Sequence, residues 1–321
     1  MLPRIRFAYL PTPVEPLPRL TTALQGPQLW VKRDDQTGLA FGGNKTRKLE
    51  YLLADARKSG AEALITAGAV QSNHCRQTAA AACRFGFTCT LVLAGEKPAH
   101  ISGNYFLDRF LGAELVWVEK SQREIALKEA FKSAREDGKQ PYLIPYGGSN
   151  AIGAAAYSFA VQELLDQKSD LDWIIFPSSS GGTQAGLLVG AEKYGFQGRI
   201  LGISVDNSAA MLQSSVSALA GETAMLLGVK REFSTEEVKV NDEYLGAGYG
   251  EMGDPEMEAL KLFALYEGLI LDPVYTGRAA AGLIDLIRRG FFTADQKVLF
   301  WHTGGTPALF ADPYLDMLSA R

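Results

Sequence analysis

The stretch DWIIFPSSSGGTQAGLLVGAEKYG, residues 172–195, contains the pattern that decides the fold class. The apolar segment at 172–180 favours a strand, and the small and apolar residues at 182–195 favour a helix. Serines and glycines fill the turn between them. Backbone N–H groups of such a turn, at the start of a helix, can hold a phosphate without a basic side chain. The stretch therefore predicts one strand–helix unit of a parallel sheet with an anion site at its turn.

The spacing of this turn differs from two common phosphate motifs. It has neither the GxxxxGK[ST] order of nucleoside triphosphate loops nor the GxGxxG order of dinucleotide-binding turns. A flexible strand–helix turn is the alternative for one such loop, but three more expected strand ends carry similar residues: TAGAVQSNH (66–74), PYGGSN (145–150) and HTGGTP (302–307). Ligands of parallel sheets bind beyond the carboxyl ends of the strands. We therefore expect the four turns to form one site.

The same alternation of strand and helix continues along the chain of 321 residues. Short apolar strands separated by helices favour buried parallel sheets, and their number favours two α/β units. The proline-rich residues 1–27 are expected to run over the surface, and 234–253 to be irregular. The expected strands are 29–35, 62–68, 88–95, 114–119, 141–148, 172–180, 199–206 and 298–305. The expected helices are 44–60, 72–86, 101–113, 123–138, 149–167, 182–195, 208–228 and 254–267.

Composition limits the classes of partner and compartment. The chain is 47% hydrophobic and 21% charged, with a formal net charge of −4, so nothing favours nucleic acid or an anionic membrane. It has no run of 18 apolar residues, and its start does not resemble a secretory signal. Three cysteines without a CxxC pair indicate a reducing compartment, so we expect a cytoplasmic protein. With only three histidines, we expect no metal site.

Lys45 stands out in FGGNKTRKLEYL, residues 41–52. Two glycines precede it, and an apolar helical pattern follows. The dipole at a helix start disfavours a cation and favours the neutral amine, which is the form that attacks a carbonyl. A lysine that accompanies a phosphate-binding turn, without a metal or nucleotide motif, indicates pyridoxal 5'-phosphate held as a Schiff base.

Six motifs resemble those of the D-cysteine desulfhydrase and 1-aminocyclopropane-1-carboxylate deaminase family: KRDD, GGNKTRKLEYL, AVQSNHCRQTAAAA, SSSGGTQAG, LDPVYTG and HTGG. The resemblance extends from about Arg19 to the end. It implies the α/β fold of the tryptophan synthase β-like enzymes, which is fold type II of the pyridoxal-phosphate enzymes. That fold has two three-layer α/β/α domains with twisted, mostly parallel sheets and the cofactor between them. We expect a large domain at 1–47 and 157–321, a small domain at 48–156, and a homodimer.

The resemblance also implies the cofactor contacts. Lys45 would carry the Schiff base, Asn73 would hydrogen-bond the cofactor's phenolic oxygen, and Lys48 would contact its phosphate. The phosphate cup would consist of Ser179, Ser180, Gly181, Gly182 and Thr183. The ring nitrogen would lie near Thr276 and Thr303.

A second group of residues would surround the α-carbon and carboxylate of a small amino-acid substrate: Ser72, Asn73, His74, Tyr249 and Tyr275. Backbone N–H groups at Ser72 and Asn73 could receive the carboxylate, although a plain N-cap is the alternative. His74 is a proton relay, an orienting group or a structural residue. Its neighbour Cys75 does not face it on a helix, so we exclude a Cys–His hydrolase. Lys45 or Tyr275 would remove the α-proton.

Thr276 and Thr303 help to predict which substrate the enzyme uses. Deaminases of this family carry a glutamate and a leucine at these places. A carboxylate would keep the ring nitrogen protonated, which ring opening should need, whereas a hydroxyl suffices to eliminate sulfide. The threonines therefore favour a D-cysteine desulfhydrase, which yields pyruvate, ammonia and hydrogen sulfide. LAFGGNKTRKLEYL looks more like the deaminases, so a deaminase and a cysteate sulfo-lyase are alternatives. A nucleotide- or NAD-binding protein and a cofactor-binding protein without turnover are alternatives of other classes.

Overall fold

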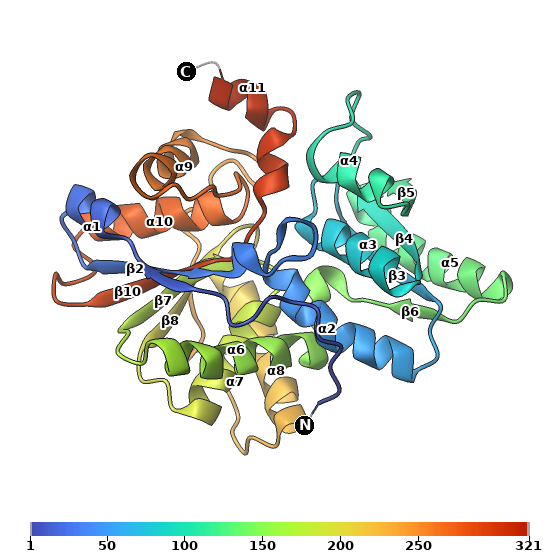
Figure 1. Cartoon of the computed structure of the whole chain (residues 1–321), viewed down its shortest axis with the longest axis horizontal. Coiled ribbons are helices and arrows are strands. Elements are labelled where there is room, and N and C mark those ends of the chain that lie inside the picture. Colours follow the sequence, from blue (N-terminus) through green and yellow to red (C-terminus); the bar gives the residue numbers. More distant parts are fainter. Residues whose placement is uncertain (1, 320–321) are drawn as a thin grey trace.

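Two sheets organise the chain in the computed structural model, which describes residues 2–319 (Figure 1). The larger sheet has the strand order β1–β2–β10–β7–β8–β9, in which only β1 runs antiparallel to its neighbour. Its strands are β1 (Val14–Pro16), β2 (Gln28–Arg33), β7 (Trp173–Ser178), β8 (Arg199–Ser204), β9 (Lys239–Asn241) and β10 (Lys297–His302). The central strands are almost wholly buried because helices cover both faces of the sheet.

Helices from distant parts of the chain cover this sheet. One face carries α1 (Pro18–Leu24), α9 (Asp254–Glu267) and α10 (Thr276–Arg288). The other carries α6 (Ala151–Gln167), α7 (Gly182–Tyr194) and α8 (Ala209–Leu227). The short α11 (Tyr314–Ser319) lies near the C-terminus. Each face therefore has its own apolar core, and the carboxyl ends of the strands stay open for a site.

The smaller sheet is entirely parallel, in the order β5–β4–β3–β6. Its strands are β3 (Ala63–Ala69), β4 (Thr88–Ala94), β5 (Glu114–Val118) and β6 (Pro141–Leu143). Helices α2 (Asn44–Lys58) and α3 (Asn73–Phe85) pack on one face, α5 (Arg123–Glu136) packs on the other, and α4 (Gly103–Phe110) packs on α3. Short 3-10 helices occur at Asp34–Gln36, Leu39–Phe41, Lys120–Gln122, Tyr146–Gly148 and Thr306–Phe310.

The expected α/β class with two mostly parallel sheets is confirmed, whereas several local expectations are corrected. The N-terminal segment does more than cover the surface, because it contains β1 and α1 and buries Leu17 and Leu20. The segment 234–253 contains the short strand β9. Strand β6 stops at Leu143, because the chain turns into a 3-10 helix at Tyr146. Helix α10 was not expected at all.

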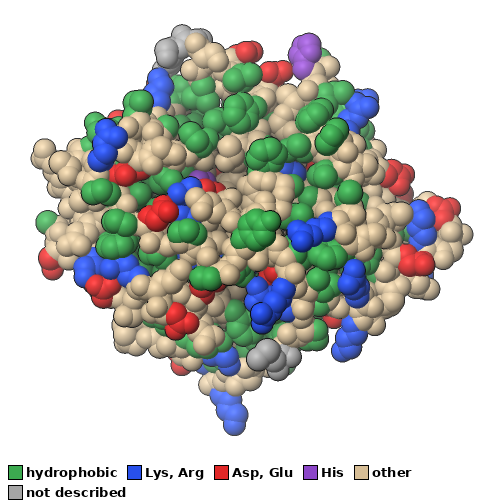
Figure 2. Space-filling view, viewed as in Figure 1, with side chains coloured by type: hydrophobic (Ala, Val, Ile, Leu, Met, Phe, Trp, Pro, Cys, Tyr) green, Lys and Arg blue, Asp and Glu red, His purple; other side chains and the backbone are tan. Residues whose placement is uncertain are grey.

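The domain boundaries proposed at 47/48 and 156/157 each fall inside a helix. Helix α2 spans Asn44–Lys58 and helix α6 spans Ala151–Gln167, and the two helices pack against each other. The chain therefore passes between the two sheets through continuous helices, and the exact boundaries stay a proposal. Acidic and basic side chains are interspersed across the face drawn in Figure 2. Among residues 2–319, no helix has both the length and the apolarity needed to cross a membrane.

Candidate active site

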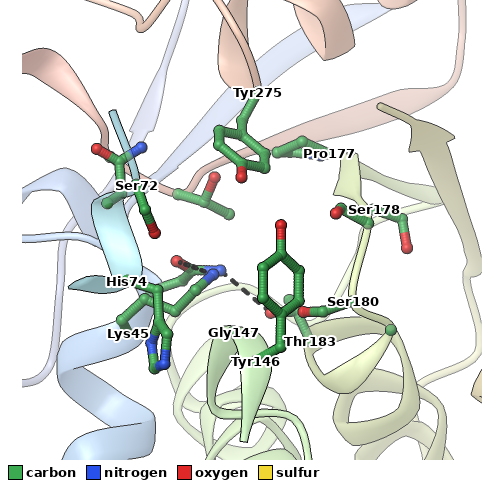
Figure 3. A pocket seen from close by; sticks show the side chains of 16 residues that line it. Lys45, Ser72, His74, Tyr146, Gly147, Pro177, Ser178, Ser180, Thr183 and Tyr275 are labelled. Atoms are coloured by element: carbon green, nitrogen blue, oxygen red, sulfur yellow. Dashed lines mark hydrogen bonds between the residues drawn. The ribbon is translucent and has the colours of Figure 1, made fainter. Parts of the chain in front are cut away.

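A polar cavity lies between the two sheets, and all four of the glycine- and serine-rich turns contribute to it (Figure 3). The turn after β3 contributes Ser72–His74, and the turn after β6 contributes Tyr146 and Gly147. The remaining lining residues are Asn44, Lys45, Pro177, Ser178, Ser179, Ser180, Gly181, Thr183, Tyr275, Thr303 and Gly304. Turns far apart in the sequence therefore meet at the carboxyl ends of parallel strands, as the pattern predicted.

Lys45 lies in the first turn of α2 and points into this cavity (Figure 3). Its Nζ donates a hydrogen bond to Asn44 Oδ1 at 3.0 Å, and Asn44 Nδ2 donates to Thr183 Oγ1 at 3.2 Å. Burial lowers the pKa of Lys45 to about 8, Asp272 opposes this shift, and Arg76 adds to it. A substantial fraction of the amine is thus neutral near pH 8. Burial is the main cause of the shift, whereas the sequence argument had invoked the helix dipole.

The turn between β7 and α7 fits a phosphate. Gly181 has φ 78° and caps α7, so the helix starts at the cavity wall. A Cβ on Gly182 would lie 2.5 Å from Ser149 Oγ and 3.0 Å from Lys48 Nζ, so a larger residue would displace these two side chains. Ser180 and Thr183 face the cavity from the start of this helix (Figure 3). Backbone at a helix N-terminus, with hydroxyls beside it, suits a dianion.

Lys48 lies behind this turn and is almost fully buried. Its Nζ donates to Gly147 O at 3.1 Å and to Ser149 Oγ at 3.4 Å. No acidic side chain of residues 2–319 forms an ion pair with it. Burial and the neighbouring Lys45 lower the pKa of Lys48 well below its usual value. A buried lysine that has only neutral partners would be stabilised by a bound anion, which agrees with the phosphate expected here.

The hydroxyl groups of Tyr249 and Tyr275 form a hydrogen bond with each other at the cavity. Their hydroxyl oxygens are 2.6 Å apart, and their rings pack edge to face with centroids at 5.8 Å. Tyr275 lines the cavity, and Tyr249 reaches it only through Tyr275. Burial raises the pKa of both tyrosines well above the usual value, and their mutual proximity raises the pKa of Tyr275 further. Both hydroxyls are therefore protonated at neutral pH. Because one hydroxyl of the pair donates to the other, one O–H is left for an anionic group, and Tyr275 is the member of the pair that lines the cavity.

Ser72 and Asn73 begin α3, as expected. The Ser72 side chain accepts a hydrogen bond from Cys75 N at 3.2 Å, so Ser72 is the N-cap residue of α3. Burial raises the pKa of the Cys75 thiol well above its usual value, so this cysteine is not a thiolate nucleophile.

His74 is buried and its hydrogen bonding determines its tautomer. Thr66 Oγ1 donates to Ile144 O at 2.8 Å, so at its 2.9 Å contact with His74 Nε2 the hydroxyl must accept. Nε2 therefore carries the proton. Burial, followed by the charges of Lys45 and Lys48, lowers the pKa of His74 well below its usual value, so the ring is neutral. These contacts favour an orienting or structural role over a proton relay.

The two threonines assigned to the ring nitrogen lie in different environments. Thr303 lines the cavity. Thr276 is fully buried outside the lining, where its Oγ1 donates to Asp272 Oδ1 at 2.6 Å and accepts from Asp272 N at 2.7 Å. This hydroxyl already has a donor and an acceptor partner. Its contact with the ring nitrogen stays a prediction.

Several residues of the site were not named from the sequence, and three of them bear polar groups that matter for its chemistry. Tyr146 and Asn44 line the cavity, and their signal was their position in PYGGSN and GGNK. Asp272 is fully buried behind it, where its carboxylate accepts from the N–H groups of Tyr275 at 3.0 Å and Thr276 at 2.7 Å. The Asp-Pro pair of LDPVYTG marks such a turn, but no local pattern indicates that the carboxylate influences Lys45.

Comparisons with known proteins agree with this geometry. A family model described as "Pyridoxal-phosphate dependent enzyme" matches residues 5–304. A D-cysteine desulfhydrase from Salmonella typhimurium is 42% identical over 320 residues, which cover 96% of each chain. A D-cysteine desulfhydrase from Salmonella typhi shows the same identity over the same share of both chains.

Solved structures give the same result. A crystal structure described as an ACC deaminase homologue superimposes with a TM-score of 0.91 at 38% identity, covering 99% of this chain and 96% of the other. Maize serine racemase superimposes with a TM-score of 0.67 at 18% identity, covering 96% and 91%, and this likeness shows the fold alone. The chain therefore belongs to the pyridoxal-phosphate dependent enzymes of the D-cysteine desulfhydrase and ACC deaminase family.

Proposed function

We propose that this enzyme eliminates sulfide from D-cysteine and forms pyruvate, ammonia and hydrogen sulfide. The observation that carries the proposal is the lining of the cavity, in which residues 2–319 contribute amides, hydroxyls, one lysine and one neutral histidine but no aspartate or glutamate. A ring nitrogen bound here would meet no carboxylate and would stay neutral. That is sufficient for β-elimination, and the relatives named D-cysteine desulfhydrase support the choice.

The residues divide into two groups around the proposed cofactor. Lys45 would hold it covalently, and Asn73 would contact its phenolic oxygen. Its phosphate would lie on the turn Ser179–Thr183 with Lys48 behind, and Thr303 would face its ring. The bound cofactor supplies a sink for the electron pair that is released at the α-carbon. The substrate carboxylate would lie at Ser72 and Asn73, at the start of α3.

Lys45 is the stronger candidate for the base that removes the α-proton. Its lowered pKa of about 8 makes the free amine available near neutral pH. The raised pKa of Tyr275 keeps its hydroxyl protonated, so this residue would donate a hydrogen bond to the substrate, with Tyr249 holding it in place. Lys45 would take the proton as the α C–H bond breaks. The electron pair of that bond would form the double bond between the α- and β-carbons only as the C–S bond breaks and sulfur leaves with the C–S electron pair. Water finally replaces the nitrogen, which leaves as ammonia.

An ACC deaminase is the second candidate. The solved structure with a TM-score of 0.91 is described as an ACC deaminase homologue, and the segment before Lys45 resembles the deaminases. Opening a cyclopropane breaks a C–C bond without a good leaving group. It should therefore need a protonated ring nitrogen, for which the cavity provides no carboxylate. The nucleotide- or NAD-binding alternative has no support from the comparisons.

A substrate panel tests the proposal. Purified enzyme loaded with pyridoxal phosphate is assayed with D-cysteine, L-cysteine, β-chloro-D-alanine, cysteate and 1-aminocyclopropane-1-carboxylate, with Lys45→Ala as the inactive control. We expect sulfide and pyruvate from D-cysteine at the highest kcat/KM, and little or no ring opening. Efficient ring opening by the wild type would support the deaminase, sulfite from cysteate the sulfo-lyase, and cofactor binding without any product a protein without turnover.

We further infer a homodimer in the cytoplasm. Two-domain relatives of this fold commonly pair, and the three cysteines are free, with Cys75 and Cys89 buried and Cys83 exposed. Free thiols suit a reducing compartment. Sedimentation equilibrium should give twice the mass of the chain, and cell fractionation should recover the activity with the cytoplasm. A monomer, or activity in another compartment, would overturn the respective inference.

A further inference from the structure

Arg76 is a fully buried arginine one turn beyond Asn73 on α3, and its guanidinium contacts neutral acceptors. NH1 donates to Asn73 Oδ1 at 2.9 Å and to Asn104 Oδ1 at 2.7 Å. NH2 donates to the carbonyl of Gly42 at 3.0 Å. None of the acidic residues described forms an ion pair with it. The arginine thus joins the loop before Lys45, the start of α3 and the start of α4.

The donor-only chemistry of Arg76 fixes the orientation of two amides. A guanidinium has no acceptor, so Asn73 and Asn104 must both turn their oxygens toward it. The amide nitrogen of Asn104 then donates to Gln71 O at 2.8 Å and to Asn73 Oδ1 at 2.9 Å. Asn73 Oδ1 accepts two hydrogen bonds and is saturated. Only the N–H donors of Asn73 are left for the cavity that this residue lines.

We propose that Arg76 is a positioning residue that holds Asn73 with its amide N–H groups toward the cofactor, so that the phenolic oxygen there is stabilised as an anion. This inference rests on the proposed function, because it takes that oxygen as the partner of Asn73. Arginine suits the task because its planar fork reaches three acceptors at once, whereas the ammonium of a lysine is a point charge on a flexible stem.

The proposal has a consequence for the proton that is shared between the phenolic oxygen and the Lys45 nitrogen. An N–H donor stabilises the oxygen when it is negative, so it lowers the pKa of that proton, and losing the donor raises it. Besides the Lys45 nitrogen itself, the charged groups near this proton are Asp272 and Arg76. Lys48 lies close enough for Lys45 to lower its pKa, and His74 is neutral. Burial lowers the pKa of Arg76 to about 10, opposed by Asp108 and Asp272, so the guanidinium is protonated at neutral pH.

A double-mutant cycle tests whether Arg76 acts through Asn73. Holoenzymes of the wild type, Arg76→Lys, Asn73→Ala and the double variant are titrated with pH while their visible absorbance is followed. The dissociation constant for pyridoxal phosphate is measured in parallel. We expect Arg76→Lys to raise the midpoint by about one pH unit and to weaken cofactor binding about tenfold, since a hydrogen bond to a charged group is lost. In the Asn73→Ala background, Arg76→Lys should change neither quantity further.

Additive effects of the two substitutions, or an unchanged dissociation constant in Arg76→Lys, would overturn the inference. If the wild-type midpoint lies below the pH range in which the protein is folded, the test uses the dissociation constants of the four proteins alone. Failure of the proposed function is distinguishable. In that case the wild type would bind no pyridoxal phosphate at Lys45, or would release no sulfide, whatever residue is present at position 76.

Two further variants separate positioning from general damage. Asn104→Ala removes the second donor to Asn73 and leaves the arginine charge in place, so the midpoint should rise by less than in Arg76→Lys. Arg84→Lys is the matched control, because Arg84 is an exposed residue of the same helix. It should leave the midpoint and the dissociation constant unchanged. An equal shift in Arg84→Lys would show that the effect is not specific to Arg76.

Discussion

Two buried arginines, Arg47 on α2 and Arg76 on α3, each lie within one turn of a proposed site residue. Their guanidinium groups differ in the charge of their hydrogen-bond acceptors. Arg47 binds two carboxylates, with Nε 2.9 Å from Asp34 Oδ2 and NH1 2.9 Å from Glu163 Oε2. Arg76 contacts amide and carbonyl oxygens. Arg76 contributes to the lowered pKa of Lys45, whereas Arg47, only two residues from Lys45, is not among its causes.

This difference separates a charge that is compensated by its contacts from one that is not. The Arg47 cluster joins α2 to the end of β2 and to α6, because Asp34 and Glu163 come from those places. Its charges compensate one another, so little of its field reaches the cavity. The charge of Arg76 has no such partner in contact and acts on the site. Proximity to Lys45 in the sequence is therefore a poor guide to influence on its pKa.

Arg47→Met should have the largest effect on stability. Asp34 is fully buried, and removing its arginine leaves Asp34 and Glu163 with only the charge of Lys32. One negative charge is then uncompensated, which typically costs about 3–5 kcal/mol. Arg76→Met removes a charge whose partners are neutral and should cost about 1–3 kcal/mol. The measurement is urea unfolding of the cofactor-free proteins. Equal losses in the two variants, or a larger loss in Arg76→Met, would contradict the distinction.

The Asp34→Asn variant should show how the charge pairing around Arg47 makes the unfolding free energy depend on pH. Burial alone would raise the pKa of Asp34, but the charges of Arg47 and Lys32 and its hydrogen bonds more than offset this and leave it below the usual 3.8. A carboxylate with a depressed pKa contributes stability that is complete above the unfolded value, near pH 4, and is lost as the pH falls through the folded value. The wild type should therefore exceed Asp34→Asn by about 2 kcal/mol at pH 7, and by less below pH 4.

Asp170→Asn is the control for this pH series. Asp170 is an exposed carboxylate that pairs with Lys168 at 2.8 Å and also with Lys297. Exposed pairs contribute about 0–1 kcal/mol, so the unfolding free energy should change little at any pH. If the advantage of the wild type over Asp34→Asn stayed constant down to pH 2, the carboxylate would not be the source of the stability.

The sequence was informative where local chemistry decides the structure. Glycine and serine at the strand ends indicated the cavity turns, and the starts of α2 and α3 lie at Asn44 and Asn73 as expected. Helix α10 was not anticipated, because its first N–H groups are satisfied by Asp272 and no capping residue directly precedes it. Arg76 looked like an ordinary basic residue of a helix. Its proposed role depends on Asn104, whose approach is a tertiary contact that no local pattern encodes.

Two glycines at the ends of α7 allow a similar comparison between a residue of the proposed site and a residue outside it. Gly181 begins the helix and Gly195 ends it, both with φ 78°. Gly181→Asp and Gly195→Asp therefore both place a side chain at a positive φ. At Gly181 the added Cβ would also lie 3.0 Å from Val216 Cγ2, whereas nothing lies within 4 Å at Gly195. Only Gly181 lies in the expected phosphate turn, so its aspartate should weaken the binding of pyridoxal phosphate at least tenfold by repulsion, while Gly195→Asp leaves binding unchanged. Equal affinities by fluorescence titration would place the phosphate elsewhere.

The attachment of the cofactor is the claim on which the other roles depend. The most direct test is to reduce the holoenzyme with borohydride, digest it, and locate the added mass by peptide mass spectrometry. We predict that the reduced cofactor is found on the peptide that contains Lys45, the lysine that lines the cavity and whose pKa is lowered to about 8. Reduced cofactor on Lys48 or Lys32, with Lys45 unmodified, would contradict the account.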